Sequence, residues 1–538
     1  MKGKKIGLIT ILTALIFCSS LLAACHSKKH VVVSTATDSK DFAESLSTLY
    51  TPIDTDNHTR PKTISENMYL AYQDNEYAPI WLSGGKPSDN AKKLVDELDG
   101  IRYDGIDPER YHVASLKNML AGFHKTNDVN NLIAFDTVFT LAYLAAAHDL
   151  LMGLIHPNSA DTVWYHPNDS TWNAPEMIAA KSNGFPSLDA YRSQVPAYKL
   201  LRNEYELVYK LRTDSALLAA ITGAAAKNKE SIDYVAKTEM PWISNEEGSS
   251  PNALLSAYQY YNDIQATGRV DSFTTAVLTR SPDQILQVLA RNMERMRWMP
   301  RETGSLYIVV NVPLAELFFI KDDNQVMHMR TVVGKPERQT PSIGASMANV
   351  VLNPPWGVPP TILKKDVLPG MDKSGVSYLN KKGLKVYDQK GNQVDPSRVN
   401  DQNYKHFTFK QDPGDDNSLG YVKFNLPNKW DIYLHDTPHR GDFPRRNRTL
   451  SSGCVRLEKP QEMALYILSE LENKRYDQER LDSVIQTHKT RWEILKTKIP
   501  VHIVYLTAYE DSTATHLRFA RDVYHRDALL DEMLQKAN

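Results

Sequence analysis

The sequence predicts a multidomain α+β protein in which helices dominate the N-terminal half and a mainly β domain follows. Within residues 135–154 apolar side chains recur at helical spacing, and Gly153 is placed to end that helix. From Leu306 onward, short β-branched and aromatic runs alternate with turn signals such as residues 322–324, a pattern typical of an antiparallel sandwich or barrel-like sheet. A chain of 538 residues accommodates about three domains.

The composition is that of an ordinary globular protein. Hydrophobic residues make up 42% and charged residues 24% of the chain, which argues against a largely disordered protein. Lys and Arg number 63 and Asp and Glu 64, so the net charge of −1 does not indicate a nucleic-acid partner. Two of the three cysteines lie in the N-terminal segment, so the rest of the chain can form no internal disulfide.

The N-terminus has the pattern of an export signal. Three lysines among the first five residues precede an apolar run that ends at Ala24, directly before Cys25. This ending resembles the bacterial lipobox, which implies a signal peptide over residues 1–25 and a lipid on Cys25; an uncleaved signal-anchor helix is the alternative. Because His rather than Asp follows, we expect anchoring to the outer membrane, facing the periplasm. Residues 26–60 are polar and predict a flexible tether.

The region between residues 61 and 304 is predicted to be mostly helical. Residues 61–213 form its first part, residues 214–280 a small module, and residues 281–304 a connecting helix. In the small module, a helix, a glycine turn and an N-cap at Asp271 predict a helical hairpin. The histidines of the first part are scattered without metal-ligand spacing, and no metal or other cofactor is expected: His112, His124, His148, His156 and His166.

The chemistry is predicted to lie between Tyr433 and Leu457. His435 follows a short strand-like run, and Cys454 is the only cysteine beyond the export signal. A thiol reacts as the thiolate, and a histidine within hydrogen-bond reach can take its proton and return it to a leaving group. Gly453 can adopt a backbone conformation that exposes the sulfur, with nearby N–H groups facing a developing oxyanion. The alternative is a lone cysteine that is simply a small buried apolar residue.

This stretch resembles the signature of the L,D-transpeptidases, the cysteine enzymes that cross-link peptidoglycan. That signature pairs a histidine, here His435, with a downstream Ser/Thr-x-Gly-Cys and Val-Arg, here residues 451–456. Ser452 stands where many members have His. The chain is similar to the large multidomain branch of the family, which implies the following parts: a scaffold domain over 61–213, a peptidoglycan-binding-like domain over 214–280 and a catalytic domain over 305–510. Beyond the resemblance, a C-terminal helix is expected over 511–538, with Arg518 to Leu530 as its clearest part.

Two of the implied parts have plain structural alternatives. Residues 361–412 are polar and interrupt the predicted sheet; the resemblance implies a lid over the active site, and the alternative is an ordinary surface insertion. The hairpin within residues 214–280 is either a glycan-binding module or a helical pair that merely packs against the scaffold.

The resemblance also implies residue roles in the catalytic domain. Cys454 would be the nucleophile, His435 the general acid and base, and Gly453 a backbone contributor to the oxyanion site. In the family a backbone carbonyl often orients the histidine. Strand alternation makes the side chain of Asp436 a poor partner for His435, because sequence neighbours on a strand point to opposite faces.

Further side chains are candidates for substrate binding. Tyr433 shares a face with His435 by the same alternation, Arg456 is placed to position a stem carboxylate, and Ser452 lies within the signature. A basic loop is either solvated or captures the anionic stem, and it holds four arginines: Arg440, Arg445, Arg446 and Arg448.

The implied reaction transfers an acyl group from a tetrapeptide stem, with release of D-Ala, to an amine of a second stem. The product is a 3→3 cross-link, formed without ATP or metal. An L,D-carboxypeptidase that uses water instead, and a non-catalytic lipoprotein that tethers the envelope to peptidoglycan, are the alternatives. The expected partners are peptidoglycan stem peptides and glycan, a membrane reached through the lipid anchor, and carbapenems as covalent inhibitors.

Overall fold

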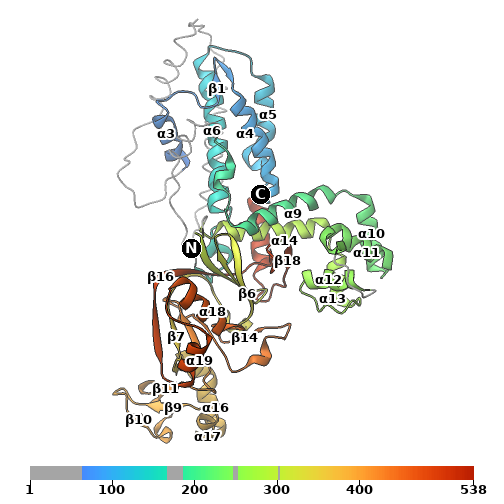
Figure 1. The fold of residues 1–538 in the computed structure, drawn as a ribbon. Helices are drawn as coiled ribbons and strands as arrows, with labels where there is room; N and C mark the ends of the chain where they lie inside the picture. The colour runs from blue at the N-terminus through green and yellow to red at the C-terminus, as the bar shows by residue number, and fades with distance from the viewer. Residues whose placement is uncertain (1–63, 166–185, 246–251, 301–302, 401) are drawn as a thin grey trace. The chain divides into compact units, whose positions relative to one another are not determined.

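The computed structural model describes residues 64–165, 186–245, 252–300, 303–400 and 402–538. The predicted signal peptide, the tether and Cys25 lie outside these residues. The chain divides into two compact units: the first holds Met1–Leu154, Asp169–Ser193 and Asn538, and the second holds Ile155–Asn168 and Gln194–Ala537 (Figure 1). Each unit has its own hydrophobic core.

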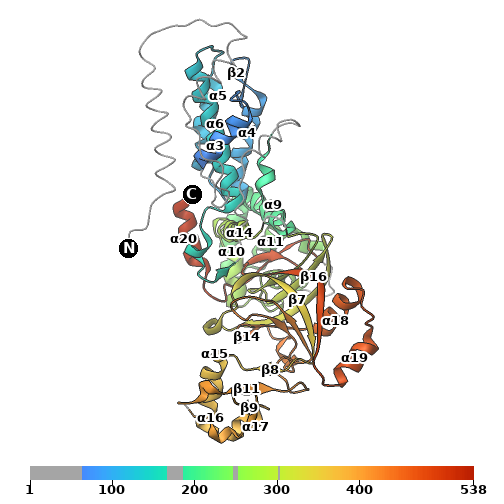
Figure 2. The ribbon, with the colours of Figure 1, turned by 90° about the vertical axis from the view of Figure 1, so that its left-hand side faces the viewer.

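The first unit is helical, as the sequence predicts. Its helices pack around α6, which ends at Gly153 with a φ of 82°. Figure 2 shows these helices side by side. They have the following bounds: α3 Ile64–Asp74, α4 Asp89–Gly100, α5 Val113–Gly122 and α6 Val129–Met152.

A buried carboxylate fixes the start of this bundle to α6. Asp136 accepts hydrogen bonds from the Tyr72 hydroxyl at 2.7 Å and from the backbone N–H of Trp81 at 2.7 Å. By length and composition alone α6 could cross a membrane, but 61% of its apolar window is buried inside the unit. Within the described residues it therefore has the properties of a core helix.

After a short helix, Pro157–Ala160, and strand β3, Trp164–Tyr165, the second unit has six longer described helices that include the predicted hairpin. Asp271 caps the second hairpin helix by accepting from the Thr274 N–H at 2.7 Å, and Gly268 makes the turn with a φ of 63°. The connecting helix begins in a capping box at Ser281. The six helices are: α9 Pro196–Leu211, α10 Ser215–Ala225, α11 Lys229–Glu239, α12 Ala253–Tyr261, α13 Ser272–Leu278 and α14 Pro282–Arg297.

The mainly β domain contains a sheet that closes on itself. Its strand order is β12-β13-β15-β6-β5-β4-β16-β7-β3, and the additional pairing of β12 with β7 closes the ring. The sheet is mixed, since β13 pairs with β15 and β16 with β4 in parallel. Its strands are β3 Trp164–Tyr165, β4 Leu306–Asn311, β5 Glu316–Lys321, β6 Asn324–Gly334, β7 Ser342–Leu352, β12 Val422–Asn425, β13 Leu434–His435, β15 Val455–Leu457 and β16 Arg491–Val504.

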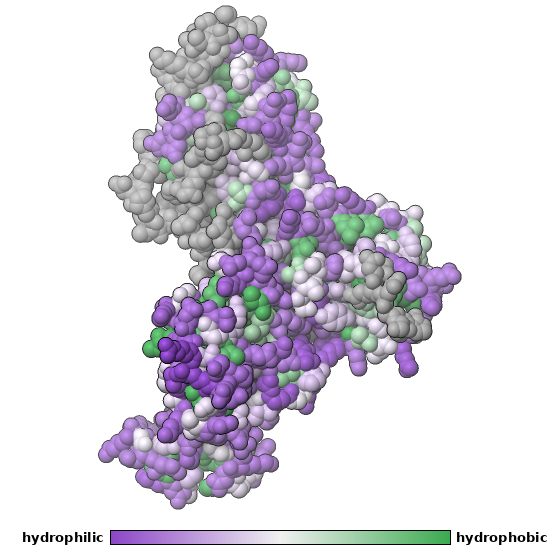
Figure 3. All heavy atoms as spheres, viewed as in Figure 1, coloured by the Kyte–Doolittle hydropathy of each residue, from purple (hydrophilic) through white to green (hydrophobic). Residues whose placement is uncertain are grey.

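The predicted insertion is a folded subdomain with a small core around Leu379, Val386 and Phe409. It starts at Trp356, five residues before the predicted boundary at 361, because Trp356 pairs with Gln411 in a small antiparallel sheet. The face of the insertion seen in Figure 3 is mainly hydrophilic, in keeping with the polar sequence of residues 361–412. Its elements are β8 Trp356–Gly357, α15 Pro360–Ile362, a π-helical turn Leu363–Val367, α16 Leu368–Ser374, α17 Val376–Lys381, β9 Lys385–Tyr387, β10 Gln393–Val394 and β11 Thr408–Gln411.

The C-terminal segment differs from the helix expected over 511–538. Strands β17 (Ala508–Glu510) and β18 (Leu517–Phe519) form a hairpin, and the terminal helix α20 covers only Asp527–Ala537. Strand periodicity prevails because Leu517 and Phe519 are buried on one face while Arg518 pairs with Glu316 at 2.8 Å. Strand β16, which covers Arg491–Val504, precedes this hairpin in the chain.

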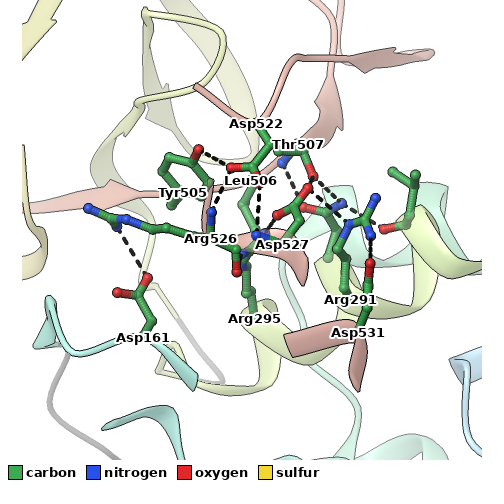
Figure 4. Close-up of polar contacts among 12 residues, drawn as sticks. Asp161, Arg291, Arg295, Tyr505, Leu506, Thr507, Asp522, Arg526, Asp527 and Asp531 are labelled. Carbon is green, nitrogen blue, oxygen red and sulfur yellow. Dashed lines mark hydrogen bonds and ion pairs between the residues drawn. The ribbon is translucent and has the colours of Figure 1, made fainter. Parts of the chain in front are cut away.

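Buried ion pairs hold this segment against α14 (Figure 4). Arg295, 1% exposed, donates to Asp527 at 2.6 Å, and Arg526 donates to Asp161 at 3.2 Å. Asp522 accepts from the Tyr505 hydroxyl at 2.5 Å. Each of these charges has a partner, so the contacts can fix the tail without leaving a desolvated ion uncompensated.

Candidate active site

Two short neighbouring strands bring the predicted catalytic residues to one face of the sheet. In the parallel pair β13–β15, Leu434 lies opposite Val455 and His435 opposite Arg456. Leu434 and Val455 are fully buried in the core. Because successive side chains alternate, His435 and Cys454, which directly precedes Val455, point to the other face. The register therefore places the histidine and the cysteine that the sequence paired on one face of two neighbouring strands.

His435 is a buried, neutral histidine with a fixed orientation. Its Nδ1 lies 2.5 Å from the backbone carbonyl oxygen of Asp436, which can only accept, so Nδ1 carries the proton and Nε2 is a free base. Burial lowers the pKa of His435 to about 3, and the charges of Arg456 and Lys423 act in the same direction. The Tyr433 ring packs edge-on against the imidazole with centroids 5.5 Å apart, which confirms that the two share a face.

The Asp436 side chain points away from the imidazole, as strand alternation predicts. Its carboxylate accepts from the Tyr421 N–H at 2.9 Å and the Thr437 N–H at 2.7 Å, and it pairs with Arg440 at 3.1 Å. The residue thus orients His435 through its backbone and stabilises the neighbouring turn through its side chain. Sequence reasoning expected a carbonyl but gave no signal for which one.

Cys454 is a half-buried free thiol that faces other groups than the imidazole. Its Sγ donates to the carbonyl of Asp431 at 3.7 Å. Burial raises the pKa of the thiol, while Tyr433 and the charge of Lys423 act in the opposite direction. No contact in the described residues joins Sγ to His435, so the resting pair is a neutral thiol beside a neutral imidazole.

The turn before the cysteine is rigid and glycine-dependent. Gly453 has a φ of 122°, a region that residues with a Cβ rarely adopt. Its N–H donates to Ser451 Oγ at 3.1 Å, and its carbonyl accepts from Thr340 Oγ1 at 2.7 Å. The Gly453 N–H is therefore engaged in the described structure, whereas the Cys454 N–H has no acceptor among the described contacts, and the oxyanion role of this turn stays a prediction.

Ser452 and Arg456, both expected to bind substrate, have protein partners. Ser452 is exposed and accepts from Arg338 at 2.9 Å. Arg338 also makes a two-point ion pair, at 2.5 and 2.7 Å, with Asp366 of the insertion. Arg456 pairs with Asp442 at 3.2 Å. The insertion is therefore linked to the cysteine turn through Arg338.

The basic loop is mostly structural, because Arg446 and Arg448 donate to backbone carbonyls of other segments, and neither of its two interpretations describes the whole loop. Arg448 donates to the Leu314 carbonyl at 2.7 Å, and Arg446 donates to the Asp263 carbonyl at 2.6 Å. Arg445 differs, since it is 61% exposed and its nearest carboxylate lies 3.5 Å away. Of the four arginines, Arg445 is the least engaged, with the single ion pair to Asp442.

Lys423 belongs to the site and was missed from the sequence. Strand β12 places it opposite His435, and its Nζ lies 4.1 Å from the centroid of the Tyr433 ring. The available signal was its position between Val422 and Phe424, two apolar residues that are both fully buried. That alternation puts Lys423 on the face of the thiol.

Together these contacts define a candidate cysteine–histidine active site in a closed β domain. Comparison with known proteins gives the family. Residues 305–501 match the L,D-transpeptidase catalytic domain, and residues 66–204 match the scaffold domain. The chain therefore carries a scaffold domain, and its catalytic domain belongs to the L,D-transpeptidase family. The predicted peptidoglycan-binding-like domain, residues 214–280, lies between the two matched ranges and stays a prediction.

Individual relatives agree with this assignment. A Haemophilus influenzae protein named as a putative L,D-transpeptidase is 35% identical over 271 residues, which are 50% of this chain and 54% of that protein. The chain thus spans about half the length of this relative.

Similar solved structures include two bacterial enzymes. A cysteine-to-serine mutant of an Enterococcus faecium L,D-transpeptidase has a TM-score of 0.19 and 10% identity, covering 38% of this chain and 52% of that one. An L,D-transpeptidase from Mycobacterium smegmatis has a TM-score of 0.19 and 13% identity, covering 37% and 58%.

Proposed function

We propose that this protein is a peptidoglycan L,D-transpeptidase with Cys454 as its nucleophile. The observation that carries the proposal is the shared face of Cys454 and His435, inside a domain of the L,D-transpeptidase family. A carbonyl-oriented, neutral imidazole with a free Nε2 is the form required of a general base. The thiol is the one group in this site suited to nucleophilic attack on a peptide carbonyl.

Acylation begins when the Cys454 side chain turns from the Asp431 carbonyl toward Nε2 of His435. The imidazole takes the thiol proton as sulfur attacks the carbonyl between the third and fourth stem residues. The N–H of Cys454 stabilises the resulting oxyanion. The C–N bond then breaks, His435 returns the proton to the departing D-Ala amine, and a thioester remains on Cys454.

Deacylation decides between the two enzymatic alternatives. If an amine of a second stem attacks the thioester, His435 accepts its proton, the thiol is restored and a 3→3 cross-link forms. If water attacks, the product is a free tripeptide and the protein is an L,D-carboxypeptidase. We favour transfer because the folded insertion is linked to the cysteine turn through Arg338 and Asp366, a placement suited to limiting water at the thioester.

We further propose export, with a lipid on Cys25 anchoring the protein to the outer membrane so that it faces the periplasm. The support is the charged and apolar N-terminal pattern that ends at Cys25. A non-catalytic tethering lipoprotein would share this location. The oriented His435 beside Cys454 favours the enzyme, since a tether needs neither group.

Product analysis by mass spectrometry tests the proposal. The purified protein is incubated with a disaccharide-tetrapeptide, with the Cys454→Ala variant as control. Release of D-Ala with a cross-linked dimer supports the transpeptidase. Release of D-Ala with free tripeptide alone would replace it by the carboxypeptidase. No release by the folded wild-type protein would leave the tethering lipoprotein.

A further inference from the structure

Lys423 presents an ammonium group to the catalytic face of the sheet. Strand β12 pairs it with His435, and its two strand neighbours, Val422 and Phe424, are fully buried on the core side. Its Nζ sits 4.1 Å from the Tyr433 ring centroid, and the segment of Tyr433 pairs with the segment of Cys454, where the Val455 N–H donates to the Tyr433 carbonyl at 3.2 Å. The ammonium is therefore held beside the nucleophile by an aromatic ring.

This ammonium lacks a counter-ion of its own. Among the described residues no carboxylate lies within ion-pair distance of Lys423, although Asp431 acts on it from farther away. Arg456, the other cation on this face, is paired with Asp442 at 3.2 Å. Lys423 is also half-buried, so water compensates its charge only in part. A partly desolvated cation without a partner favours an anionic ligand.

We propose that Lys423 binds a substrate carboxylate adjacent to the scissile bond, namely the terminal carboxylate of the departing D-amino acid. This inference rests on the proposed function. In a tetrapeptide donor that carboxylate is separated from the attacked carbonyl carbon by three covalent bonds, so a cation beside the nucleophile can reach it. In a pentapeptide the carboxyl carbon of the fourth residue belongs to an uncharged peptide bond. Lys423 thus selects donors that end at the fourth residue.

Two other roles for Lys423 make different predictions. A counter-ion for the Cys454 thiolate would change the reactivity of the sulfur toward every electrophile, charged or neutral. A lysine that merely covers the Tyr433 ring would leave the reactivity of the sulfur unchanged toward both charged and neutral electrophiles. Only carboxylate binding separates an anionic electrophile from a neutral one of the same size.

Two haloacetyl reagents make this distinction without a peptide substrate. Iodoacetate and iodoacetamide both alkylate the thiolate with loss of iodide, but only iodoacetate carries a carboxylate next to the reacting carbon. The rate of each is measured on the peptide 449–456, which contains Cys454, so Cys18 and Cys25 do not interfere. Taking the ratio of the two rates at one pH cancels the thiolate fraction common to both.

The variants are Lys423→Met, Lys423→Arg and a matched control, Lys410→Met. Lys410 also lies over a tyrosine ring, 5.3 Å from Tyr387, but within the insertion. We expect the iodoacetate-to-iodoacetamide ratio to fall about tenfold in Lys423→Met, to recover in Lys423→Arg and to stay unchanged in Lys410→Met. A ratio that stays unchanged in Lys423→Met, whether both rates fall equally or neither falls, would overturn the proposal.

A donor pair extends the test to the proposed reaction. The release of the fourth residue is compared between a tetrapeptide with a free C-terminal carboxylate and the same peptide with a C-terminal amide. We expect the wild-type protein to prefer the free acid and Lys423→Met to lose most of that preference. A preference kept by Lys423→Met contradicts the inference alone, whereas no release of either peptide by the wild-type protein contradicts the proposed function.

Discussion

Nδ1 of His435 lies 2.5 Å from the backbone carbonyl oxygen of its neighbour Asp436, and this contact determines which ring nitrogen can act as a base. A carbonyl accepts but does not donate, so the proton resides on Nδ1 and Nε2 is free. A backbone group performs the task that an acidic side chain performs in a Ser-His-Asp triad. The orientation of the imidazole is therefore insensitive to the charge at position 436.

The first prediction separates the His435 ring from the Asp436 carboxylate. His435→Ala removes the base and should slow acylation by at least about 100-fold. Asp436→Asn keeps the backbone carbonyl but weakens the contacts to Thr437 and Arg440, so it should lower thermal stability and leave acylation within about tenfold of wild type. Single-turnover D-Ala release and thermal melting measure the two effects. A loss in Asp436→Asn as large as that in His435→Ala would place the carboxylate in the relay.

The second prediction concerns the pH dependence of Cys454. Burial raises the pKa of the thiol and lowers that of His435 to about 3, so neither group is ionised between pH 5 and pH 7. The thiolate fraction, and with it the rate of alkylation by iodoacetamide, should rise with pH and show its inflection above the ordinary range of a free thiol. Glutathione serves as the reference. A rate plateau already below pH 7 would instead indicate a thiolate–imidazolium pair.

The third prediction compares two glycines near the site. A Cβ at position 453 would meet only ordinary contacts, the nearest at 3.6 Å from Ile432, so the cost of Gly453→Ala comes from its φ of 122°. That strain is about 1–3 kcal/mol, and it should lower the melting temperature and displace Cys454. Gly441→Ala is the control, because its Cβ would meet nothing within 4 Å and its φ is not positive. Equal behaviour of the two variants would show that the turn tolerates other backbone conformations.

The fourth prediction tests the link between the insertion and the cysteine turn. Asp366→Ala removes the partner of Arg338, so hydrogen exchange in residues 360–381 should quicken about fivefold, as expected for the loss of about 1 kcal/mol. Alkylation of Cys454 should also quicken as the insertion loosens.

A second acidic residue of the insertion provides the control for this link. Asp412 pairs with Lys385 inside the subdomain and makes no contact with Arg338 in the described structure. Asp412→Ala should therefore leave alkylation of Cys454 unchanged. If Asp366→Ala leaves it unchanged as well, the ion pair does not restrain access to the thiol.

The sequence predicts the succession of helical and β parts that the structure shows, and strand alternation correctly placed Tyr433 with His435. The catalytic roles of His435 and Cys454 stay predictions, with the two residues on neighbouring strands. Alternation could not identify the carbonyl beside Nδ1, because this contact depends on backbone angles at the end of a two-residue strand. For the same reason, the sequence does not predict the hydrogen bond from the Gly453 N–H to Ser451 Oγ.

Long-range pairing explains the remaining differences. Lys423 reaches the site only because β12 pairs with β13, and this pairing has no local signature. The helix expected over 511–538 includes the strand Leu517–Phe519, because only two apolar positions mark the strand periodicity there. The insertion begins at Trp356 because that residue pairs with Gln411, far along the chain. For Lys423 and Trp356, a partner farther along the chain outweighs the local pattern.

The most direct test of the central claim is covalent capture of Cys454 by a carbapenem, followed by mass spectrometry of the peptide 449–456. The proposed mechanism predicts one acyl adduct on this peptide, and none on the Cys454→Ala variant or on the peptides that contain Cys18 and Cys25. An unmodified peptide 449–456, in a protein whose Cys454 still reacts with iodoacetamide, would contradict the assignment of Cys454 as the acyl-accepting nucleophile.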